Sequence, residues 1–523
     1  MVKKQIFILV FLSILMGGVY FWLVTPGRTE ANVSHRFDWP DETTNYFWSV
    51  NYAQTGQLII DEPLNIIAKN QIHPRSFNVR DDGALVPGSF LGLILFYGTL
   101  AKIFSTKAII YFTPILSILG VLAFYGIIRR IFNNQIAFLA AILMLAHPAW
   151  WYYSVTSMLP NVAFVSLILV AIYFLFRGNK LSLSQILISG LLTGLAVAIR
   201  PAEIIWLMAT YASIFVYLRS KISFTKIILF LAVAVIVFSP AIYQQKSIYG
   251  NFLTSGYSQL DAGSESICHS CQIAKSLILP FGFHPTTAVL NFWNHYLSNL
   301  WWLSLLAILG LVAFLTQTGK QKIEIFGYMG ISLFIFGWLI IYYGSWLFTD
   351  LLTVHLNTLG LSYVRYWLPL YLLALPFVAI GLIFLTNFVK RRFRNIVLFL
   401  LLVFLFYSSA NLVLQKKPDS ILPVRNRIVS YKENASKVIE LTEPEAVIVT
   451  VRKDKLFFPD RRVIHSFEAL SRNDSLIDLL PGLLEAVPVY YYALAPESTL
   501  DLERGLQLEL VTNVGQELLY KIK

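Results

Sequence analysis

The sequence predicts an all-α polytopic membrane protein with about eleven transmembrane helices, followed by a small extracytoplasmic α/β domain at the C-terminus. Hydrophobic residues make up 57% of the 523 residues and charged residues only 13%, whereas soluble domains are about a quarter charged. The mean hydropathy is +0.64, and the local hydropathy falls sharply after residue 415. The chain up to that residue is therefore expected to lie mainly in a membrane.

The first apolar span runs from Ile6 to Val24, directly after the basic pair Lys3 and Lys4. This span is longer than the hydrophobic part of a usual signal peptide, and no Ala-x-Ala-like cleavage site follows it. We therefore expect an uncleaved first transmembrane helix.

Apolar stretches that could be membrane helices continue to residue 414. Together with the first span they cover residues 6–24, 88–104, 107–128, 135–148, 161–176, 183–199, 202–218, 226–243, 298–317, 325–347, 366–387 and 395–414. A spanning helix needs about 20 residues. Several stretches are shorter, so length alone does not decide which of them cross.

Basic residues indicate the topology because they gather in alternate gaps between these stretches. One set of gaps, with the N-terminus, holds Lys3, Lys4, Arg129, Arg130, Arg177, Lys180, Arg219, Lys221, Lys226, Lys320, Lys322, Lys390, Arg391, Arg392 and Arg394. Apart from the long stretch 25–106, the other set holds only Arg200, Lys246, Lys275 and Arg365. The positive-inside rule then places the N-terminus in the cytoplasm and the C-terminus outside. This alternation requires that residues 88–104 do not cross, so we expect a helix along the outer surface there.

The topology predicts a membrane domain over residues 1–415 and a soluble extracytoplasmic domain over residues 416–523. Two long outer loops, 25–106 and 244–297, belong to the membrane domain. The formal net charge of +12 is explained by the basic gaps between spans, so we do not expect nucleic-acid binding.

The soluble tail has the pattern of a small α/β domain. Residues 446–451 form a β-branched run, and Val463-Ile464 starts a second one. Residues 475–485 have a helical pattern, and 487–494 again resemble a strand. Alternating strands and helices favour an α/β fold. The tail has no glycine-rich phosphate loop, so we expect an accessory role.

The two cysteines of the chain form a Cys-His-Ser-Cys arrangement at Cys268 and Cys271. A redox or metal site would need a thioredoxin-like context or a second ligand pair, and neither is visible. His269 and His284 leave a weak metal site open. A local disulfide or two free thiols is the favoured interpretation.

An acidic patch, Asp38 to Glu42, follows the first span and is the main candidate for chemistry. A carboxylate near low-dielectric surroundings is a strong acceptor and a tunable base. Asp41 is the candidate base, with Glu42 as its neighbour. The same residues are also a good helix start, with Asp41 as the cap, and both interpretations can hold together.

Two cations stand at the outer ends of apolar spans, Arg200 and Arg365. Arginine binds phosphate through two parallel hydrogen bonds and keeps its charge when partly desolvated. Both are therefore candidates for binding a donor phosphate. The alternative is snorkelling to the membrane interface, and Glu203 is placed to pair with Arg200 at i and i+3.

In their order, several motifs resemble the GT-C glycosyltransferases, most closely the branch of protein O-mannosyltransferases and lipid A aminoarabinose transferases. These motifs are Trp39 to Tyr46, similar to a Pro-Asp-Glu-Thr-like signature; Val86 to Phe90, similar to the start of a surface helix; Gly194 to Pro201, similar to a fifth span; and Arg365 to Pro369, similar to a late Arg-Tyr-x-x-Pro element. The resemblance covers about residues 1–415.

The resemblance implies an integral-membrane glycosyltransferase in the plasma or inner membrane, with its active site on the outer face. It implies transfer from a polyprenyl-phosphate-linked sugar to a protein, lipid or cell-envelope glycan, by an inverting displacement. Such a reaction needs a base for the acceptor hydroxyl and positive groups for the departing phosphate. Asp41 with Glu42 and Arg365 with Arg200 are expected in these roles.

One departure from the family concerns a second acidic residue, expected after the third span in a Leu-Pro-Asp-like stretch. Here the stretch reads Leu159-Pro160-Asn161. Asn161 can form hydrogen bonds but cannot be a charged metal ligand. A divalent cation remains possible, and we name no metal ligand for it. Asn161, His73 and Arg75 are weaker candidates for substrate contacts, and a plain surface-loop role fits His73 and Arg75 equally well.

Two other classes of function remain open. A transporter or flippase of lipid-linked envelope precursors would carry ionisable residues deep within its spans. In this sequence the notable charges lie at span ends, and no internal repeat is visible. A membrane assembly or binding protein would instead depend mainly on the soluble tail.

Overall fold

The computed structural model describes residues 2–24, 37–178, 180–252, 254–259, 278–316, 323–348, 357–494 and 505–523. They fall into two compact units. The helical unit comprises Met1–Val24, Tyr111–Pro240 and Glu265–Pro423, and the mixed unit comprises Thr25–Ile110, Ala241–Ser264 and Val424–Lys523. Each unit therefore combines segments that are far apart in the sequence. The domain bounds expected from the sequence, 1–415 and 416–523, remain a prediction. They divide the chain at a single point, whereas each compact unit takes up three segments.

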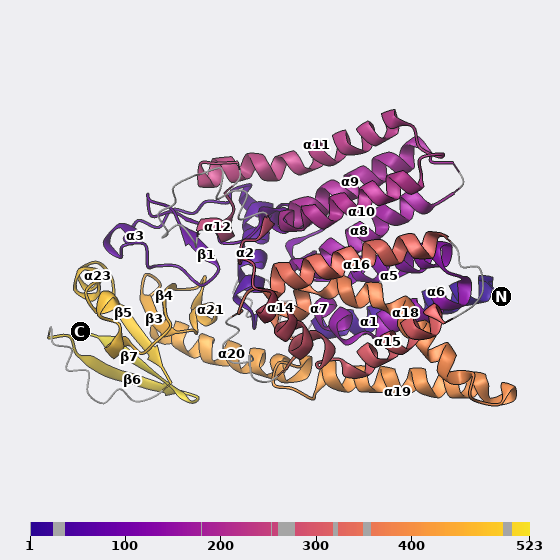
Figure 1. Ribbon diagram of the computed structural model, residues 1–523. Coiled ribbons are helices and arrows are strands. Elements are labelled where there is room, and N and C mark those ends of the chain that lie inside the picture. The colour runs from indigo at the N-terminus through magenta and orange to yellow at the C-terminus, as the bar shows by residue number, and fades with distance from the viewer. Residues whose placement is uncertain are drawn as a thin grey trace. The chain divides into compact units, whose positions relative to one another are not determined.

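The helical unit is built from apolar helices (Figure 1). They are α1 (Val2–Val24), α5 (Ile109–Ile131), α6 (Asn134–Ala146), α7 (Pro148–Val155), α8 (Pro160–Phe176), α9 (Leu183–Ile199), α10 (Ile204–Tyr217), α11 (Phe224–Tyr249), α14 (Pro285–Phe292), α15 (Trp301–Leu315), α16 (Ile323–Gly344), α17 (Ser362–Tyr366), α18 (Leu368–Thr386) and α19 (Arg394–Leu414). The first residues of α5, 109–110, and the last residues of α11, 241–249, belong to the mixed unit.

Six helices among the described residues are long and apolar enough to cross a membrane, or nine if each bent pair is one span. The sequence predicted about eleven because it also counted α8, which has 17 residues, and treated α9 and α10 as two spans. The chain bends by 115° between Leu183–Ile199 and Pro201–Tyr217. Pro201 explains this break, since proline cannot continue the helical hydrogen bonds and restricts the residue before it.

Close helix packing in this unit depends on glycine. Helices α15 and α18 lie side by side (Figure 1). A Cβ atom on Gly310 would lie 1.8 Å from the carbonyl oxygen of Phe377, and one on Gly381 would lie 2.3 Å from that of Leu306. Small residues allow backbones to approach in this way in membrane helices.

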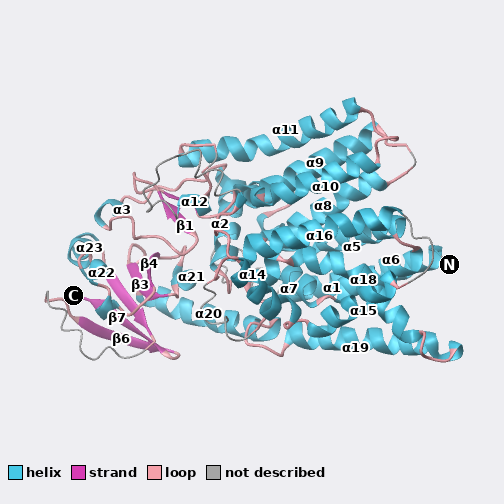
Figure 2. Cartoon of the chain, in the orientation of Figure 1, coloured by secondary structure: helices cyan, strands magenta, loops and turns pink. Residues whose placement is uncertain are grey.

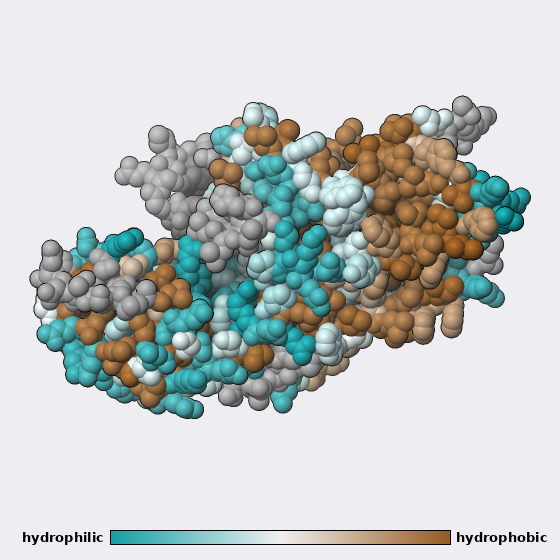
Figure 3. Space-filling view, turned by 90° about the horizontal axis from the view of Figure 1, so that it is seen from below, coloured by the Kyte–Doolittle hydropathy of each residue, from teal (hydrophilic) through white to brown (hydrophobic). Residues whose placement is uncertain are grey.

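The outside of the helical unit carries many large apolar side chains, as lipid contact requires. On α19, for example, Phe399, Leu400 and Phe404 are 64%, 58% and 60% exposed. Figure 3 shows a continuous area of hydrophobic side chains on the face in view.

The mixed unit contains the sheets (Figure 2). Its elements are α2 (Pro40–Thr55), α3 (Leu64–Ile67), β1 (Phe77–Val79), β2 (Leu85–Pro87), α4 (Leu91–Ile103), α12 (Gly256–Gln259), β3 (Val447–Val451), α21 (Asp454–Phe457), β4 (Arg462–Ser466), α22 (Asp474–Ile477), α23 (Leu480–Ala486), β5 (Val489–Ala493), β6 (Leu508–Val514) and β7 (Glu517–Ile522). Helix α20 (Ile421–Leu441) leads into it. The small α/β fold predicted for the tail is confirmed, and helix α4 lies where a surface helix was expected.

The five-stranded sheet has the order β4-β3-β5-β7-β6. Strands β4, β3 and β5 are parallel, while β7 is antiparallel to both β5 and β6. Ile72 and His73 form isolated bridges with Ile464 on the edge strand β4. This segment of the first loop therefore covers one edge of the sheet, which would otherwise expose unpaired backbone groups.

Both faces of the sheet are buried, which explains the unbroken β-branched run of β3. Ile448 packs in a core with Trp48 and Phe77. Its neighbour Val449 points the other way, as successive strand residues do, and packs in a second core with Ile72. The first loop thus supplies core residues to both faces of the C-terminal sheet.

Candidate active site

The acidic motif lies at the start of α2. The helix begins at Pro40, which suits a first helical position because proline needs no hydrogen-bond acceptor there. The cap residue is Trp39, whose side chain makes no capping hydrogen bond. The prediction that Asp41 caps a helix from Glu42 is therefore wrong, because the helix starts at Pro40 and already includes Asp41 in its first turn. A carboxylate in that turn is favoured by the helix dipole.

Asp41 is partly exposed, and Ser76 holds its carboxylate. The Ser76 hydroxyl donates a hydrogen bond of 2.7 Å to Asp41 Oδ1. Ser76 has a left-handed backbone with φ 64°, an uncommon conformation for a residue with a side chain. Gly88 lies so close that a Cβ atom there would be 2.4 Å from the Ser76 carbonyl oxygen. The serine is thus fixed by a tight fit, and it orients a carboxylate that remains accessible.

Glu42 differs from Asp41, since it is 0% exposed. A buried side chain does not contact a substrate directly. The position of Glu42 therefore favours the predicted role of a neighbour that supports Asp41. Asn45, on the next turn of α2, accepts a hydrogen bond of 2.9 Å from Ser89. Polar side chains of α2 are therefore tied to the segment that precedes α4.

Asp38, just before α2, is bound by two cations from the C-terminal region. Arg427 donates to both carboxylate oxygens, from Nε at 3.0 Å and from Nη2 at 2.8 Å. Lys455 Nζ lies 3.9 Å from Asp38 Oδ1 and also donates to the Asp38 carbonyl oxygen. Burial lowers the pKa of Lys455 to about 8, although Asp38 opposes this shift.

Arg75 precedes Ser76 and forms a buried ion pair with Asp454. Its backbone N–H and its Nε each donate to the Asp454 carboxylate at 2.8 Å. Asp454 is 1% exposed and Arg75 is 19% exposed at their side chains. Burial alone would raise the pKa of Asp454, but the Arg75 charge and hydrogen bonds lower it overall. This pairing favours a structural role for Arg75 over the predicted substrate contact.

His73 lies next to His465, with ring centroids 5.2 Å apart. Its Nδ1 is 3.0 Å from the Pro74 carbonyl oxygen. Burial and the neighbouring His465 lower the pKa of His73 to about 4, so the ring is neutral at pH 7. No group of three or more His, Cys, Asp or Glu side chains in the described part of the chain could hold a metal ion. Cys268 and Cys271 lie outside the described residues.

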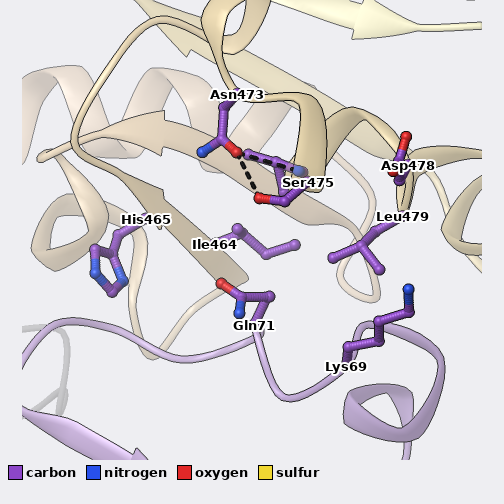
Figure 4. Close-up of a pocket in the computed structure, with 9 residues that line it drawn as sticks. Lys69, Gln71, Ile464, His465, Asn473, Ser475, Asp478 and Leu479 are labelled. Carbon is purple, nitrogen blue, oxygen red and sulfur yellow. Dashed lines mark hydrogen bonds between the residues drawn. The ribbon is translucent and has the colours of Figure 1, made fainter. Parts of the chain in front are cut away.

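A small polar cavity of about 170 Å³ lies beside β4 (Figure 4). Lys69 and Gln71 face it from the first loop, and His465, Asn473 and Ser475 face it from the C-terminal region. Asp41 does not line this cavity.

In the helical unit, Arg200 is the centre of a buried cluster. It is 5% exposed, and its Nε and Nη2 donate to Glu203 Oε1 at 3.0 and 2.8 Å. Tyr343 OH accepts from Arg200 at 2.7 Å and donates to Glu203 at 2.6 Å. The predicted pair of Arg200 with Glu203 is confirmed. Since Glu203 compensates its charge, Arg200 is the weaker candidate for phosphate binding.

Arg365 lies in the short helix α17 and is partly exposed. Its Nη2 donates to the hydroxyls of Ser362 and Tyr366 at 3.2 and 3.3 Å. The ring of Tyr366 lies 4.9 Å from Arg365 Cζ and 5.0 Å from Arg200 Cζ. One aromatic ring therefore contacts both predicted cations, through cation–π interactions that fix their positions.

Asn161 joins the same cluster from the start of α8. It is 4% exposed, and its Nδ2 donates to the Arg365 carbonyl oxygen at 2.9 Å. Its Oδ1 is buried without a hydrogen-bond partner among the described residues. The residue that replaces the expected acid thus positions the backbone of the exposed arginine.

The structure groups the predicted site residues into two clusters. The cationic cluster, in the helical unit, contains Arg200, Arg365 and Asn161, and the acidic cluster, in the mixed unit, contains Asp41, Glu42, His73 and Arg75. Sequence reasoning missed Ser76, Arg427, Asp454 and Lys455 in the acidic cluster and Tyr343 and Tyr366 in the cationic one. Tyr366 had a signal, because it follows Arg365 in the Arg-Tyr motif. The others lie 35 or more positions from the charged residues with which they form hydrogen bonds, so no local pattern could have revealed them.

The apolar helices and the two charged clusters define a polytopic membrane protein that carries a carboxylate site in its mixed unit. The chain matches the family model "Dolichyl-phosphate-mannose-protein mannosyltransferase" over residues 92–243. That stretch includes Asn161 and Arg200. No curated protein matches this sequence at a significant level.

The fold is similar to that of ArnT from Cupriavidus metallidurans. The ArnT structure bound to undecaprenyl phosphate has 11% identity and a TM-score of 0.60, over 99% of this chain and 98% of that one. The apo structure has 10% identity and a TM-score of 0.57 over the same shares. The predicted resemblance to GT-C glycosyltransferases is thus confirmed in fold.

Proposed function

We propose that this protein transfers a sugar from a polyprenyl-phosphate donor to a hydroxyl group of a protein, lipid or cell-envelope glycan. The reaction would take place on the outer face of the plasma or inner membrane, with the N-terminus in the cytoplasm and the C-terminal region outside. The match to a mannosyltransferase family and the fold of ArnT, solved with undecaprenyl phosphate, support this donor class. The observation that carries the proposal is the accessible Asp41 carboxylate, oriented by Ser76.

In the proposed reaction, Asp41 accepts the proton of the acceptor hydroxyl as that oxygen attacks the anomeric carbon. The bond from the anomeric carbon to the phosphate oxygen breaks, and the polyprenyl phosphate leaves with its bonding electrons. Attack opposite the leaving group inverts the anomeric configuration. A positioned base of this kind typically contributes about 10²–10⁴-fold in rate. Holding both reactants in place contributes more.

Arg365 is the proposed contact for the leaving phosphate, because it is the more exposed of the two cations. Its planar guanidinium can donate two parallel hydrogen bonds to phosphate oxygens. Arg200 has a positioning role in this proposal. Its charge is compensated by Glu203, and it contacts the Tyr366 ring that Arg365 also contacts.

The test begins with the lipid and glycan profile of cells that lack the protein. A single missing sugar, together with an accumulated lipid-linked donor, would name both substrates. The cells are then complemented with the wild type, Asp41→Asn or Asp81→Asn, where Asp81 is an exposed loop residue that serves as the matched control. At equal protein levels, Asp41→Asn should fail to restore the sugar and Asp81→Asn should restore it. Full restoration by Asp41→Asn would remove Asp41 from the mechanism.

A further inference from the structure

We propose that Asp454 and Lys455, adjacent residues of α21, are positioning residues for Asp41. They come from the C-terminal region and hold the two chain segments on either side of the Asp41 carboxylate. This inference rests on the proposed function, in which Asp41 is the base.

Lys455 holds the segment that leads into Asp41. Its side chain is 9% exposed, and its ammonium group pairs with Asp38 Oδ1 at 3.9 Å. The same group donates to the backbone carbonyl oxygen of Asp38. Asp38 lies less than one helical turn before Asp41, so a contact to its backbone constrains where α2 begins. Arg427 completes this hold on the Asp38 carboxylate.

Asp454 holds the segment that carries the Asp41 hydrogen-bond donor. It accepts hydrogen bonds from the backbone N–H and from Nε of Arg75, both at 2.8 Å. The next residue, Ser76, donates to Asp41 Oδ1. Arg75 is further tied to the C-terminal region, since its Nη2 donates to the Arg452 carbonyl oxygen at 2.6 Å. The position of the serine hydroxyl is therefore linked to Asp454 through a single residue.

The chemistry of these contacts indicates a positioning role. Buried ion pairs contribute little net stability compared with apolar packing of similar volume, because both ions lose their hydration. They are directional, however, and hydrogen bonds to a charged group are the stronger kind. The unit already has apolar cores on both faces of its sheet. What Asp454 and Lys455 add is a defined geometry for residues 38 and 75.

The consequence concerns the role of the C-terminal region. The sequence suggested an accessory domain, because it has no phosphate loop. By this inference, residues 424–523 instead complete the active site without contacting substrate. Removing either ionic contact should displace the Asp41 carboxylate by a fraction of an ångström to about 1 Å, a misplacement that can cost about 10²-fold in rate.

The experiment uses the full-length protein in membranes of cells that lack the native copy, titrated with the lipid extract of those cells. The variants are Asp454→Asn and Lys455→Met, with Asp454→Glu and Lys455→Arg as conservative partners. We expect the two disruptive variants to lower kcat at least about tenfold with little change in KM for the donor extract. Lys455→Arg should recover most of the rate, since it keeps the charge.

A matched control is the ion pair of Glu62 with Arg462, at 2.9 Å. It also joins the first loop to the C-terminal region, but neither residue adjoins Asp38 or Ser76 in sequence. Arg462→Gln should leave kcat within about twofold of the wild type. If Arg462→Gln lowers kcat as much as Asp454→Asn does, the loss reflects a general weakening of the contact between the first loop and the C-terminal region. The inference then fails.

A double variant separates positioning from simple loss of fold. Ser76→Ala and Asp454→Asn act on the same hydrogen bond to Asp41, so their combined loss of kcat should not exceed the larger single loss. Additive losses would overturn the inference. So would wild-type kcat in Asp454→Asn and Lys455→Met while Asp41→Asn is inactive, an outcome that leaves the proposed function intact. A fully active Asp41→Asn would instead remove the proposed function itself.

Discussion

The acidic and cationic clusters satisfy their charges in different ways. In the cationic cluster the neutral groups Tyr343 and Asn161 come from distant segments, but the charged partners Arg200 and Glu203 are neighbours in sequence. In the acidic cluster they lie hundreds of residues apart, since Arg75 and Asp454 are separated by 379 positions and Asp38 and Lys455 by 417.

The difference follows from what surrounds each cluster. A helix end in an apolar unit offers few polar groups, so a buried cation is most readily matched by a residue one turn away on the same segment. A unit built around a sheet brings distant strands and loops together, so its charges are matched across the fold. Local pairing can be predicted from sequence, whereas distant pairing cannot.

The largest expected effect tests the local pair. Glu203→Gln leaves the Arg200 charge buried with no carboxylate beside it, which typically costs about 3–5 kcal/mol. The thermal midpoint and the unfolding midpoint in detergent should both fall. The double variant Arg200→Met with Glu203→Gln should recover part of the loss, because it removes the uncompensated charge.

Glu324→Gln is the control for that experiment, since Glu324 is a partly exposed residue of α16 in the same unit. Its effect should stay within about 0.5 kcal/mol. Equal losses of unfolding free energy in Glu203→Gln and Glu324→Gln would show that the pair of Arg200 with Glu203 has no special importance for stability.

The next effect tests the distant pairs. Asp38→Asn removes the carboxylate that Arg427 and Lys455 share, and Lys455 is 9% exposed. We expect a loss of about 2–3 kcal/mol, because a buried ammonium group is left with a weaker acceptor. Urea unfolding followed by protease resistance of the C-terminal region would measure it. Glu509→Gln, at an exposed ion pair with Lys523, should cause no measurable loss.

A smaller effect should appear in the binding of undecaprenyl phosphate to the protein in nanodiscs. Arg365→Ala should weaken it about tenfold, equivalent to about 1.4 kcal/mol, through loss of charge-assisted hydrogen bonds. Arg365→Lys should restore only part, since lysine lacks the two-pronged geometry.

In the same assay, Arg391→Ala changes an exposed arginine outside both clusters and should bind as the wild type does. Unchanged binding by Arg365→Ala would favour snorkelling to the membrane interface as the role of Arg365.

The smallest effect near neutral pH is a pH dependence in the acidic cluster, and it grows as the pH falls. The folded-state pKa of His73 is lowered from 6.5 to about 4, so between these values the unfolded chain binds a proton that the folded chain does not. Stability should therefore fall as the pH is lowered from 6.5 towards 4. His73→Gln should flatten the slope of unfolding midpoint against pH, while His284→Gln, at an exposed site, should not. An unchanged slope in His73→Gln would contradict the assigned burial effect.

Sequence reasoning reached much of the fold because its signals are local. Apolar stretches predicted the helices, and β-branched runs such as 446–451 predicted β3 within one residue. The hairpin β6–β7 was missed, because Leu508–Val514 is mostly solvent-facing and lacks a buried pattern. Pro201 indicates a break in the helix at Arg200, but no feature of the sequence indicates the angle of the bend.

For the site, the sequence identified Asp41, Arg365 and Arg200 through motif order and through charge at span ends. It misread the helix cap, since cap propensity favours aspartate, whereas Pro40 at the first helical position makes the preceding residue, Trp39, the cap. Asp454, Lys455 and Arg427 gave no local signal, and their assignment needs the contacts of the fold.

By itself, the sequence determined the apolar helices, the α/β tail, the acidic motif and the pairing of Arg200 with Glu203. Each depends on residues within a few positions of one another, where hydropathy, propensity and helical spacing act directly. Only the tertiary structure decided that Ser76 orients Asp41 and that the C-terminal region holds both flanking segments. Those contacts depend on how a sheet gathers distant segments, and no short-range rule encodes that arrangement.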